Sequence, residues 1–258
     1  MNLGLIGKSL KHSFSKHYFE QKFMHGNYGH CSYQNFELPE INEEILNGII
    51  EQNALSGFNV TIPYKEQIVP FIHQLTPEAK EIGAVNTVLI EPHKNNHKYY
   101  LSGYNTDYIG FLKSIRPFLT YQHQKALILG TGGAAKSIHY ALKSLGCECW
   151  FVSRDKKENI LQHFVYSELN ETIIKHFKLI VNTTPLGTFP QVEDFPPIPF
   201  QYIGKEHLLF DLIYNPETTV FLEYGRKQGA AIINGLSMLQ FQAEEAWKIW
   251  NQKKGNSD

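Results

Sequence analysis

Short apolar runs and longer stripes with helical spacing alternate along the chain, which is the pattern of an α/β protein. In the first hundred residues the runs predict strands at Leu3–Gly7, Gly57–Ile62, Ala84–Ile90 and Tyr99–Tyr104, the last two joined by a polar loop, Glu91–Lys98. Apolar residues from Ile41 to Ile50 form one stripe and predict a helix that opens at Pro39. Thr76 followed by Pro77 predicts the start of another helix.

A second series of strands and helices starts near residue 120. Its strands are expected at Lys125–Gly130, Cys149–Val152, Leu179–Val181, Leu208–Leu212 and Ala231–Ile233. Their alternation with helices predicts a parallel sheet with right-handed crossovers. A final helix is expected from Met238 to about Lys253, capped by Ser237, and its wide apolar face is expected to pack back on the first series.

Composition narrows the classes of function. The chain has 258 residues, 42% of them apolar, which suffices for one large domain or two smaller ones. Lys plus Arg total 24 and Asp plus Glu total 25, so no basic field indicates a nucleic-acid or membrane partner. No apolar run approaches the roughly 18 residues of a transmembrane helix, and the N-terminus lacks the pattern of a secretory signal.

Cysteine and histidine usage predicts neither disulfides nor a metal site. The three cysteines, Cys31, Cys147 and Cys149, form no CxxC pair, so a reducing cytoplasm is the expected compartment. His93 and His97 are four residues apart in a polar stretch without further ligands, which favours a solvated loop over a metal centre.

A glycine-rich turn between a strand and a helix is the first sign of chemistry. The segment Gly130-Thr-Gly132-Gly133-Ala134-Ala135 would allow a backbone to approach a pyrophosphate at a helix N-terminus. A plain strand–turn–helix junction is the alternative. An NAD site usually has an acidic residue about 20 positions on, but here Ser153-Arg154-Asp155 follows the next strand. An arginine can accept a 2′-phosphate, which favours NADP. Asp155 could pair with Arg154 or admit NAD, and Arg154 could be a solvated charge.

Several polar residues interrupt apolar or strand-like surroundings in the first series. They are Ser13, Ser15, Asn59, Thr61, Lys65, Asn86, Asn105 and Asp107. Each has a structural alternative when taken singly. Ser15 could cap a helix, Asn86 could lie in a bulge, Lys65 could be an exposed first-turn lysine, and Asp107 could be a first-turn acid.

Taken together, eight segments resemble the shikimate dehydrogenase family. They are HSFS (12–15), GFNVTIPYKE (57–66), GAVNTV (83–88), GYNTDYIGF (103–111), ILGTGGAAKSI (128–138), VNTTPLG (181–187), DLIYNP (211–216) and NGLSMLQFQAEEAW (234–247). The resemblance implies an α/β substrate domain (1–104 and 236–258) with a mixed, mainly parallel sheet. It also implies a Rossmann-type NADP-binding domain (105–235) and a last helix that returns to the first domain.

The resemblance also implies a role for each matching residue. Substrate-binding residues are expected to be Ser13, Ser15, Thr61, Lys65, Asn86, Asp107, Tyr214 and Gln242, of which Lys65 and Asp107 are the catalytic pair. Cofactor-binding residues are expected to be Gly130, Gly132, Gly133, Ala134, Ser153, Arg154, Gly235 and Met238. The family typically has Asn-Arg-Thr or Asn-Arg-Ser where this chain has Ser153-Arg154-Asp155, which leaves the choice of cofactor open.

The implied activity is the reversible, NADPH-dependent reduction of 3-dehydroshikimate to shikimate, on the route to chorismate and aromatic amino acids. One alternative is a dehydrogenase acting on both quinate and shikimate, with NAD as a possible cofactor. A non-enzymatic alternative is a dinucleotide-sensing module, which would need the glycine turn but not Lys65 together with Asp107. The expected partner is a small-molecule substrate, and a monomer or a homodimer is expected.

Overall fold

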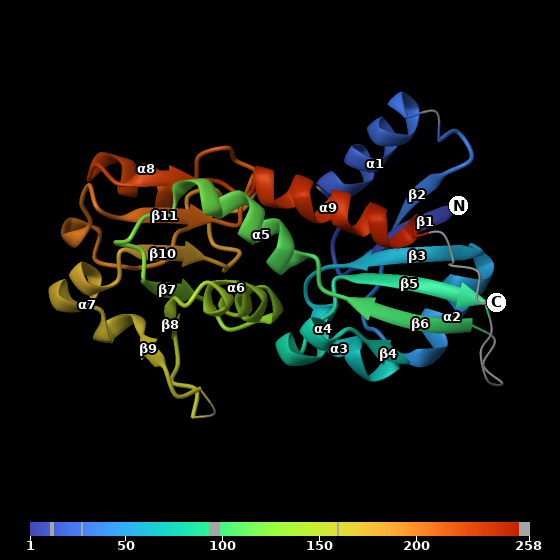
Figure 1. Ribbon diagram of the computed structural model, residues 1–258, viewed down its shortest axis with the longest axis horizontal. Coiled ribbons are helices and arrows are strands. Elements are labelled where there is room, and N and C mark those ends of the chain that lie inside the picture. Colours follow the sequence, from blue (N-terminus) through green and yellow to red (C-terminus); the bar gives the residue numbers. More distant parts are fainter. Residues whose placement is uncertain (11–12, 27, 93–98, 159, 253–258) are drawn as a thin grey trace. The chain divides into compact units, whose positions relative to one another are not determined.

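The computed structural model describes residues 1–10, 13–26, 28–92, 99–158 and 160–252, and it contains two compact units (Figure 1). Unit 1 comprises Met1–Thr106 and Ala243–Asp258, and unit 2 comprises Asp107–Gln242. The boundary therefore falls inside the last helix, α9 (Leu236–Trp250), rather than at 236. The first turns of α9 belong to unit 2 because Met238 is buried in its core.

Unit 1 is built on a mixed six-stranded sheet in the order β2-β1-β3-β5-β6-β4. The strands are β1 (Asn2–Gly7), β2 (Ser32–Glu37), β3 (Leu55–Val60), β4 (Gln74–Leu75), β5 (Thr87–Pro92) and β6 (Tyr99–Tyr104). Strand β1 is parallel to β2 and β3, and β4 is parallel to β6, whereas β5 runs antiparallel to β3 and β6. The predicted mixed, mainly parallel sheet is confirmed.

Helices cover both faces of the first sheet (Figure 1). Helix α1 (Phe14–His25) and the C-terminal part of α9 lie on one face, and α2 (Glu43–Gln52), α3 (Tyr64–Gln67) and α4 (Pro77–Ile82) lie on the other. The indole Nε1 of Trp250 donates to the carbonyl oxygen of Val88 at 3.0 Å, and a Cβ atom at Gly57 would lie only 2.4 Å from that nitrogen. This close fit holds the end of α9 on the sheet.

Unit 2 is built on a six-stranded sheet that is parallel throughout, in the order β12-β11-β10-β7-β8-β9. Its strands are β7 (Lys125–Leu129), β8 (Glu148–Ser153), β9 (His163–Val165), β10 (Leu179–Asn182), β11 (Leu208–Asp211) and β12 (Ala231–Ile233). With β7 counted as the first strand, this is the strand order 3-2-1-4-5-6 of the Rossmann fold. The predicted parallel sheet is confirmed.

Helices also pack on both faces of the second sheet. Helices α5 (Asp107–Ile115) and α6 (Gly133–Ser144) bury apolar residues against one face, and α7 (Glu171–His176) and α8 (Val220–Lys227) against the other. Short 3₁₀ turns lie at Val69–Phe71, Arg116–Phe118, Tyr166–Glu168 and Phe200–Tyr202. Among the described helices, none has both the length and the apolar character needed to cross a bilayer.

Several predicted element boundaries were wrong, and side-chain capping explains two of them. Helix α2 begins at Glu43 rather than at Pro39, because Asn42 accepts the N–H of Ile45 at 2.9 Å and caps the helix there. Helix α9 begins at Leu236 rather than at Met238, since Asn234 accepts the N–H of Leu236 at 3.2 Å. Ser237 therefore lies inside the first turn and is not the cap.

Further expectations also need correction. Ser15 lies within the first turn of α1, whose N-cap residue is Ser13. Strand β5 starts at Thr87 instead of Ala84 and continues through Glu91 and Pro92, which were predicted as loop because of their polarity. The remainder of that predicted loop, residues 93–98, lies outside the described residues. The last helix ends at Trp250, before its predicted end at about Lys253.

Candidate active site

Polar residues of unit 1 gather at one edge of its sheet because of the strand directions. Strands β1, β3 and β6 end at the edge where β5 begins, since Asn59 pairs with Thr87 and Thr87 pairs with Tyr104. The Thr61 N–H donates to the carbonyl oxygen of Ile6 at 2.9 Å, which places Thr61 at the end of β1. The N–H of Val85 donates to the Lys65 carbonyl oxygen at 2.8 Å. Thr61, Lys65 and Asn86 are thus brought to the same edge.

Asn86 organises the turn that leads from β6 into the next unit. Its side chain is 2% exposed, and its Oδ1 accepts the backbone N–H of Thr106 at 2.7 Å. Its Nδ2 donates to the Thr106 hydroxyl at 3.0 Å. The side-chain amide of the preceding residue, Asn105, donates to the carbonyl oxygen of Ala84 at 3.0 Å. Asn86 therefore holds the backbone that immediately precedes Asp107, in addition to any contact with a ligand.

A chain of hydrogen bonds links Ser15 to the same edge. The Asn59 amide donates to the Thr87 hydroxyl at 3.0 Å, and the Tyr33 hydroxyl donates to Asn59 Oδ1 at 2.8 Å. Burial raises the pKa of the Tyr33 phenol, and a hydrogen bond with Ser15 partly opposes that rise. Within the described residues, Ser13 makes no side-chain capping hydrogen bond to α1, although it is the N-cap residue.

The remaining predicted substrate residues occupy different elements. Lys65 is half-buried in the short helix α3 of unit 1. Asp107 opens α5 of unit 2 and is 2% exposed, so it is indeed the first-turn acid that the sequence suggested. Tyr214 is half-buried after β11. Gln242 is half-buried in α9, where a Cβ atom added to Gly110 would lie 3.0 Å from its backbone nitrogen.

The glycine turn has the features of a dinucleotide cradle. Gly130 has φ +114°, and a Cβ atom there would lie 2.6 Å from Thr183 Oγ1, so only glycine fits. Gly132, the N-cap residue of α6, is exposed, and a Cβ atom there would meet no described atom within 4 Å. The first turn of α6, which contains Gly133 and Ala134, carries no acidic residue and no side-chain cap. Its amides suit the pyrophosphate of NADP.

A second loop faces the glycine turn from the neighbouring strand β10. The Thr183 N–H and hydroxyl both donate to the carbonyl oxygen of Leu129, at 3.0 and 2.6 Å. Asn182 is fully buried, and its Oδ1 accepts the N–H of Thr184 at 3.0 Å and its hydroxyl at 2.7 Å. Because the strand order reverses between β7 and β10, this is where a Rossmann sheet binds its ligand. Sequence reasoning assigned no role to Thr183 or Thr184, although the segment VNTTPLG was noticed.

The segment that carries Tyr214 is fixed by a buried carboxylate. Asp211 accepts the Thr219 hydroxyl at 2.6 Å and the N–H of Ile213 at 3.1 Å. Burial raises the pKa of Asp211 to about 6, although these hydrogen bonds oppose the rise. The Gly235 N–H donates to the carbonyl oxygen of Ile213 at 2.9 Å, so Gly235 lies directly beside this segment. The Met238 side chain is buried in the core of unit 2.

The predicted 2′-phosphate residues follow strand β8. Ser153 is half-buried at the end of the strand, and Arg154 and Asp155 are exposed. The positive charge of Arg154 lies close enough to Tyr166 to lower the pKa of its phenol, against the larger effect of burial. In the described part of the chain, no three His, Cys, Asp or Glu residues are grouped to hold a metal ion. His93 and His97 lie outside the described residues.

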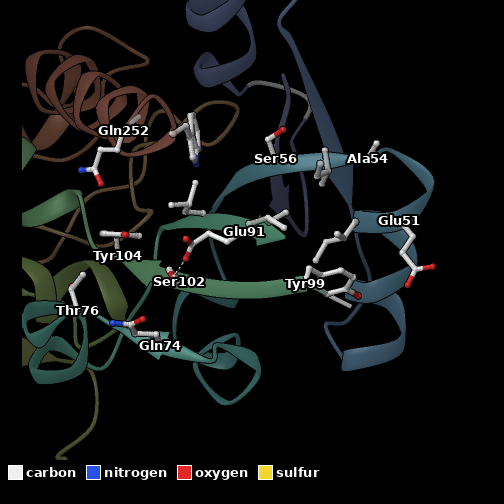
Figure 2. Close-up of a pocket in the computed structure, with 16 residues that line it drawn as sticks. Glu51, Ala54, Ser56, Gln74, Thr76, Glu91, Tyr99, Ser102, Tyr104 and Gln252 are labelled. Atoms are coloured by element: carbon white, nitrogen blue, oxygen red, sulfur yellow. Dashed lines mark hydrogen bonds between the residues drawn. The ribbon is translucent and has the colours of Figure 1, made fainter. Parts of the chain in front are cut away.

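A pocket of about 780 Å³ opens elsewhere on unit 1 (Figure 2). It lies over β3, β5 and β6 beside the end of α9, and Figure 2 shows Glu91, Ser102, Tyr104 and Gln252 around it. The Ser102 hydroxyl donates to the Glu91 carboxylate at 3.2 Å. Its described lining includes none of the predicted site residues. The pocket is therefore distinct from the edge that carries Thr61 and Asn86.

Comparison with known proteins identifies the family. Residues 5–88 match the family described as the shikimate dehydrogenase substrate binding domain. A shikimate dehydrogenase (NADP(+)) of Clostridium botulinum (strain Hall) is 38% identical to this chain, over 96% of the chain and 95% of the relative. The chain belongs to the shikimate dehydrogenase family. The resemblance drawn from the eight sequence segments is confirmed.

Solved structures of this family share the fold. The shikimate dehydrogenase of Aquifex aeolicus superimposes with a TM-score of 0.84 at 33% identity, covering 99% of this chain and 94% of that one. The shikimate 5-dehydrogenase of Thermus thermophilus, solved in complex with NADP(H) and shikimate, gives a TM-score of 0.81 at 28% identity. That comparison covers 97% of this chain and 93% of the other.

Proposed function

We propose that this chain is an NADP-dependent shikimate dehydrogenase. It reduces 3-dehydroshikimate to shikimate with NADPH, reversibly, on the route to chorismate and aromatic amino acids. The observation that carries the proposal is the 38% identity, over 96% of the chain, to a shikimate dehydrogenase (NADP(+)). Two features of the structure support it: one sheet edge carries Thr61, Lys65 and Asn86, and the turn at Gly130 suits a dinucleotide.

Hydroxyl and amide groups hold the substrate in this proposal. The Ser13, Ser15 and Tyr214 hydroxyls bind the carboxylate, and Ser13 suits this role because its side chain does not cap the described helix α1. Thr61, Asn86 and Gln242 bind the ring hydroxyls. Such a site rejects analogues that lack a hydroxyl, because a buried polar partner would then be left without a hydrogen bond.

Lys65 is the proposed proton donor, with Asp107 as its partner on the substrate. NADPH, when bound, supplies the hydride that adds to the ring ketone. Negative charge then develops on the ketone oxygen, and the Lys65 ammonium stabilises it and transfers a proton from Nζ. A positioned proton donor of this kind contributes roughly 10²–10⁴-fold to the rate. The Asp107 carboxylate accepts a hydrogen bond from a neighbouring substrate hydroxyl.

The cofactor is held by unit 2 in this proposal. The amides of Gly130, Gly132, Gly133 and Ala134 bind the pyrophosphate, Ser153 and Arg154 bind the 2′-phosphate, and Gly235 and Met238 adjoin the nicotinamide. Asp155 beside Arg154 favours a second candidate, a dual quinate/shikimate dehydrogenase that also uses NAD, because an acidic residue at this strand end suits a ribose without phosphate.

A spectrophotometric assay tests the proposal. Purified protein is given shikimate or quinate, each with NADP⁺ or NAD⁺, and the formation of reduced nicotinamide is followed by its absorbance. Strong turnover only with shikimate and NADP⁺ supports the main proposal. Comparable turnover with quinate or NAD⁺ supports the dual-specificity candidate. Dinucleotide binding without turnover in any combination would contradict both and favour a dinucleotide-sensing module.

We also propose that the enzyme works in the cytoplasm as a monomer or a homodimer. The small-molecule substrate and a biosynthetic family support the compartment, and nothing in the proposed site requires a second copy of the chain. Sedimentation equilibrium across a concentration series gives the oligomeric state, and a larger assembly would contradict this expectation.

A further inference from the structure

A buried histidine lies directly behind the loop that carries Arg154. Strands β8 and β9 are parallel neighbours, and His163, the first residue of β9, pairs with Phe151. The connection between these strands contains no helix among its described residues. The His163 side chain is only 1% exposed, so it fills the space beneath this connection. Both nitrogens of its ring lie within hydrogen-bonding distance of residues that flank Arg154, Ser153 and Lys157.

The hydrogen bonds of His163 define its protonation state. Its Nδ1 accepts the backbone N–H of Lys157 at 3.1 Å, and a backbone N–H can only donate, so Nδ1 carries no proton. The neutral ring then carries its proton on Nε2, which donates to Ser153 Oγ at 2.8 Å. The Ser153 hydroxyl in turn donates to the carbonyl oxygen of Asp155 at 2.7 Å. This directional chain requires the neutral ring.

The same histidine binds the loop through its backbone. Lys156 Nζ donates to the His163 carbonyl oxygen at 2.6 Å and pairs with Glu168 at 3.5 Å. Residues on both sides of Arg154 are thus tied to His163, while Arg154 itself is exposed. A loop held at Ser153 and Lys157 leaves the Arg154 backbone little freedom, so its side chain extends from a fixed point of the backbone.

Burial and the neighbouring lysines keep the ring of His163 neutral. Burial lowers the pKa of His163 below its ordinary 6.5, and the cations Lys156 and Lys157 act in the same direction. Glu168 opposes them with a smaller effect than Lys156. At neutral pH the ring is therefore the uncharged form that the hydrogen bonds need. At a pH below this lowered pKa the ring gains a proton on Nδ1, which then faces the Lys157 N–H.

We propose that His163 is a positioning residue for recognition of the adenosine 2′-phosphate. Its neutral ring fixes residues 153–157 so that Arg154 and its flanking amides receive the phosphate without first being ordered. This inference rests on the proposed function, because it presumes that Arg154 binds the 2′-phosphate of NADP(H). It adds a residue that never touches the cofactor but that determines the preference for NADP(H) over NAD(H).

Dinucleotide affinity measured on His163 variants tests the proposal. His163→Leu removes both side-chain hydrogen bonds, and the dissociation constants of NADPH and NADH are measured by nucleotide fluorescence at about pH 7.5. We expect NADPH to bind about tenfold more weakly, the effect of one or two lost hydrogen bonds, and NADH affinity to change by less than about twofold. The KM for NADPH should rise while the KM for shikimate stays constant. Equal losses for both nucleotides would overturn the proposal.

His207 offers a matched control. It is 3% exposed, its Nε2 lies 2.9 Å from the carbonyl oxygen of Ile174, and burial lowers its pKa as well. It precedes β11, so it lies at the opposite edge of the parallel sheet from Ser153. His207→Leu should therefore match any loss of stability without changing the ratio of NADPH to NADH affinity. An equal change of that ratio in both variants would overturn the proposal.

A pH series distinguishes a positioning role of the neutral His163 ring from an electrostatic role of the protonated ring. His163→Asn keeps an acceptor for the Lys157 N–H but cannot titrate, and the titration of the ligand's own phosphate is common to both proteins. We expect wild-type affinity for NADPH, relative to this variant, to fall as the pH is lowered below the ordinary histidine pKa of 6.5 and the ring is protonated. A relative rise would mean that the ring acts as an added positive charge, which would overturn the proposal.

Failure of the inference is distinguishable from failure of the proposed function. If the wild type neither binds NADPH nor oxidises shikimate, the proposed function fails. If it does both and His163→Leu has wild-type affinity for NADPH, only the inference fails. Should His163→Leu not fold, as judged by circular dichroism, His163→Asn and His163→Gln decide, because each keeps one of the two hydrogen bonds. Wild-type selectivity in both would overturn the inference.

Discussion

At Gly235 the backbone leaves no room for a side chain. A Cβ atom there would lie 2.0 Å from the carbonyl oxygen of Leu212, and the Gly235 N–H is held by Ile213 at 2.9 Å. Backbone on both sides cannot move apart as a flexible side chain could. We expect Gly235→Ala to lower the free energy of unfolding by about 1–3 kcal/mol, the usual cost of overpacking, and to lower NADP-dependent turnover. Urea denaturation measures the first effect.

Gly48 is the control for this substitution. It lies inside helix α2, and a Cβ atom there would meet no described atom within 4 Å. Gly48→Ala should raise the free energy of unfolding by about 0.5–1 kcal/mol, because alanine loses less backbone entropy in a helix. If both variants have wild-type stability, the close approach at Gly235 does not exist in solution.

Lys65 is expected to act directly in proton transfer. Lys65→Ala should lower kcat for shikimate oxidation by roughly 10²–10⁴-fold, because the ring hydroxyl loses the group that accepts its proton in this direction. NADPH affinity should stay unchanged, since Lys65 belongs to unit 1 and the glycine cradle to unit 2. Lys80→Ala, an exposed lysine in α4, serves as the control. Near-wild-type turnover of Lys65→Ala would remove Lys65 from the catalytic role.

Only some site residues were predictable from the sequence. Thr61, Lys65 and Asn86 stand out because they interrupt apolar or strand-like segments, and the resemblance gave them roles. Tyr33 and Thr183 were missed because ordinary strand and loop positions give no signal of their own. Their importance follows from the register that brings Asn59 opposite Thr87, and from strand β10 lying beside β7. Single segments do not contain that information.

At the scale of elements, a capping residue is predictable where only one candidate is present. Thr76 caps α4 as expected, accepting the N–H of Ala79 at 3.2 Å. Before α9 two candidates compete, and Asn234 is used instead of Ser237, so the helix starts earlier than predicted. The sequence shows both side chains but not which backbone conformation precedes the helix.

The link between β11 and α8 gives a prediction about pH. The Thr219 hydroxyl donates to Asp211 at 2.6 Å and accepts the N–H of Leu222 at 3.4 Å, so a buried carboxylate joins the strand to the helix cap. Burial raises the pKa of Asp211 from its ordinary 3.8 to about 6. Between these values the folded protein binds more protons than the unfolded chain, so the contribution of Asp211 to stability falls as pH rises.

Asp211→Asn tests whether the contribution of Asp211 to stability falls as pH rises. The difference in free energy of unfolding, wild type minus variant, should fall by up to about 3 kcal/mol between about pH 4 and 6 and be flat above about pH 7. Urea denaturation at several pH values gives the difference, in which the other titrating groups cancel. Parallel pH profiles for the two proteins would show that the Asp211 carboxyl titrates as it does in the unfolded chain.

At the scale of the whole molecule, the two units differ in how far the sequence determines them. The parallel sheet of unit 2 was predictable because strands alternate with helices and crossovers are right-handed. The sheet of unit 1 was predictable only as a mixed sheet. The sheet also contains β4, which pairs with β6 at its outer side and is only two residues long. A strand of two residues is too short to show the alternation of apolar and polar residues that predicts a strand.

Each unit has its own buried cores, so local opening of each can be followed separately, and each ligand should protect most strongly the amides next to the residues that bind it. Ligand at 100 times its dissociation constant adds about 2.7 kcal/mol to the stability of the state that binds it. Hydrogen exchange by mass spectrometry should then show NADP⁺ slowing exchange at residues 130–135 and 183–184. Shikimate should slow it at residues 13–15 and 61–65.

The pocket in Figure 2 is the internal control for that experiment. Its lining strands, at residues 89–91 and 99–104, should exchange at the same rate with and without shikimate, because the pocket includes none of the predicted site residues in its described lining. Slower exchange there, with no change at residues 61–65, would mean that the ring acid binds over β5 and β6. The sheet edge that carries Thr61 and Lys65 would then lose its assignment, while the dinucleotide cradle of unit 2 would keep its own.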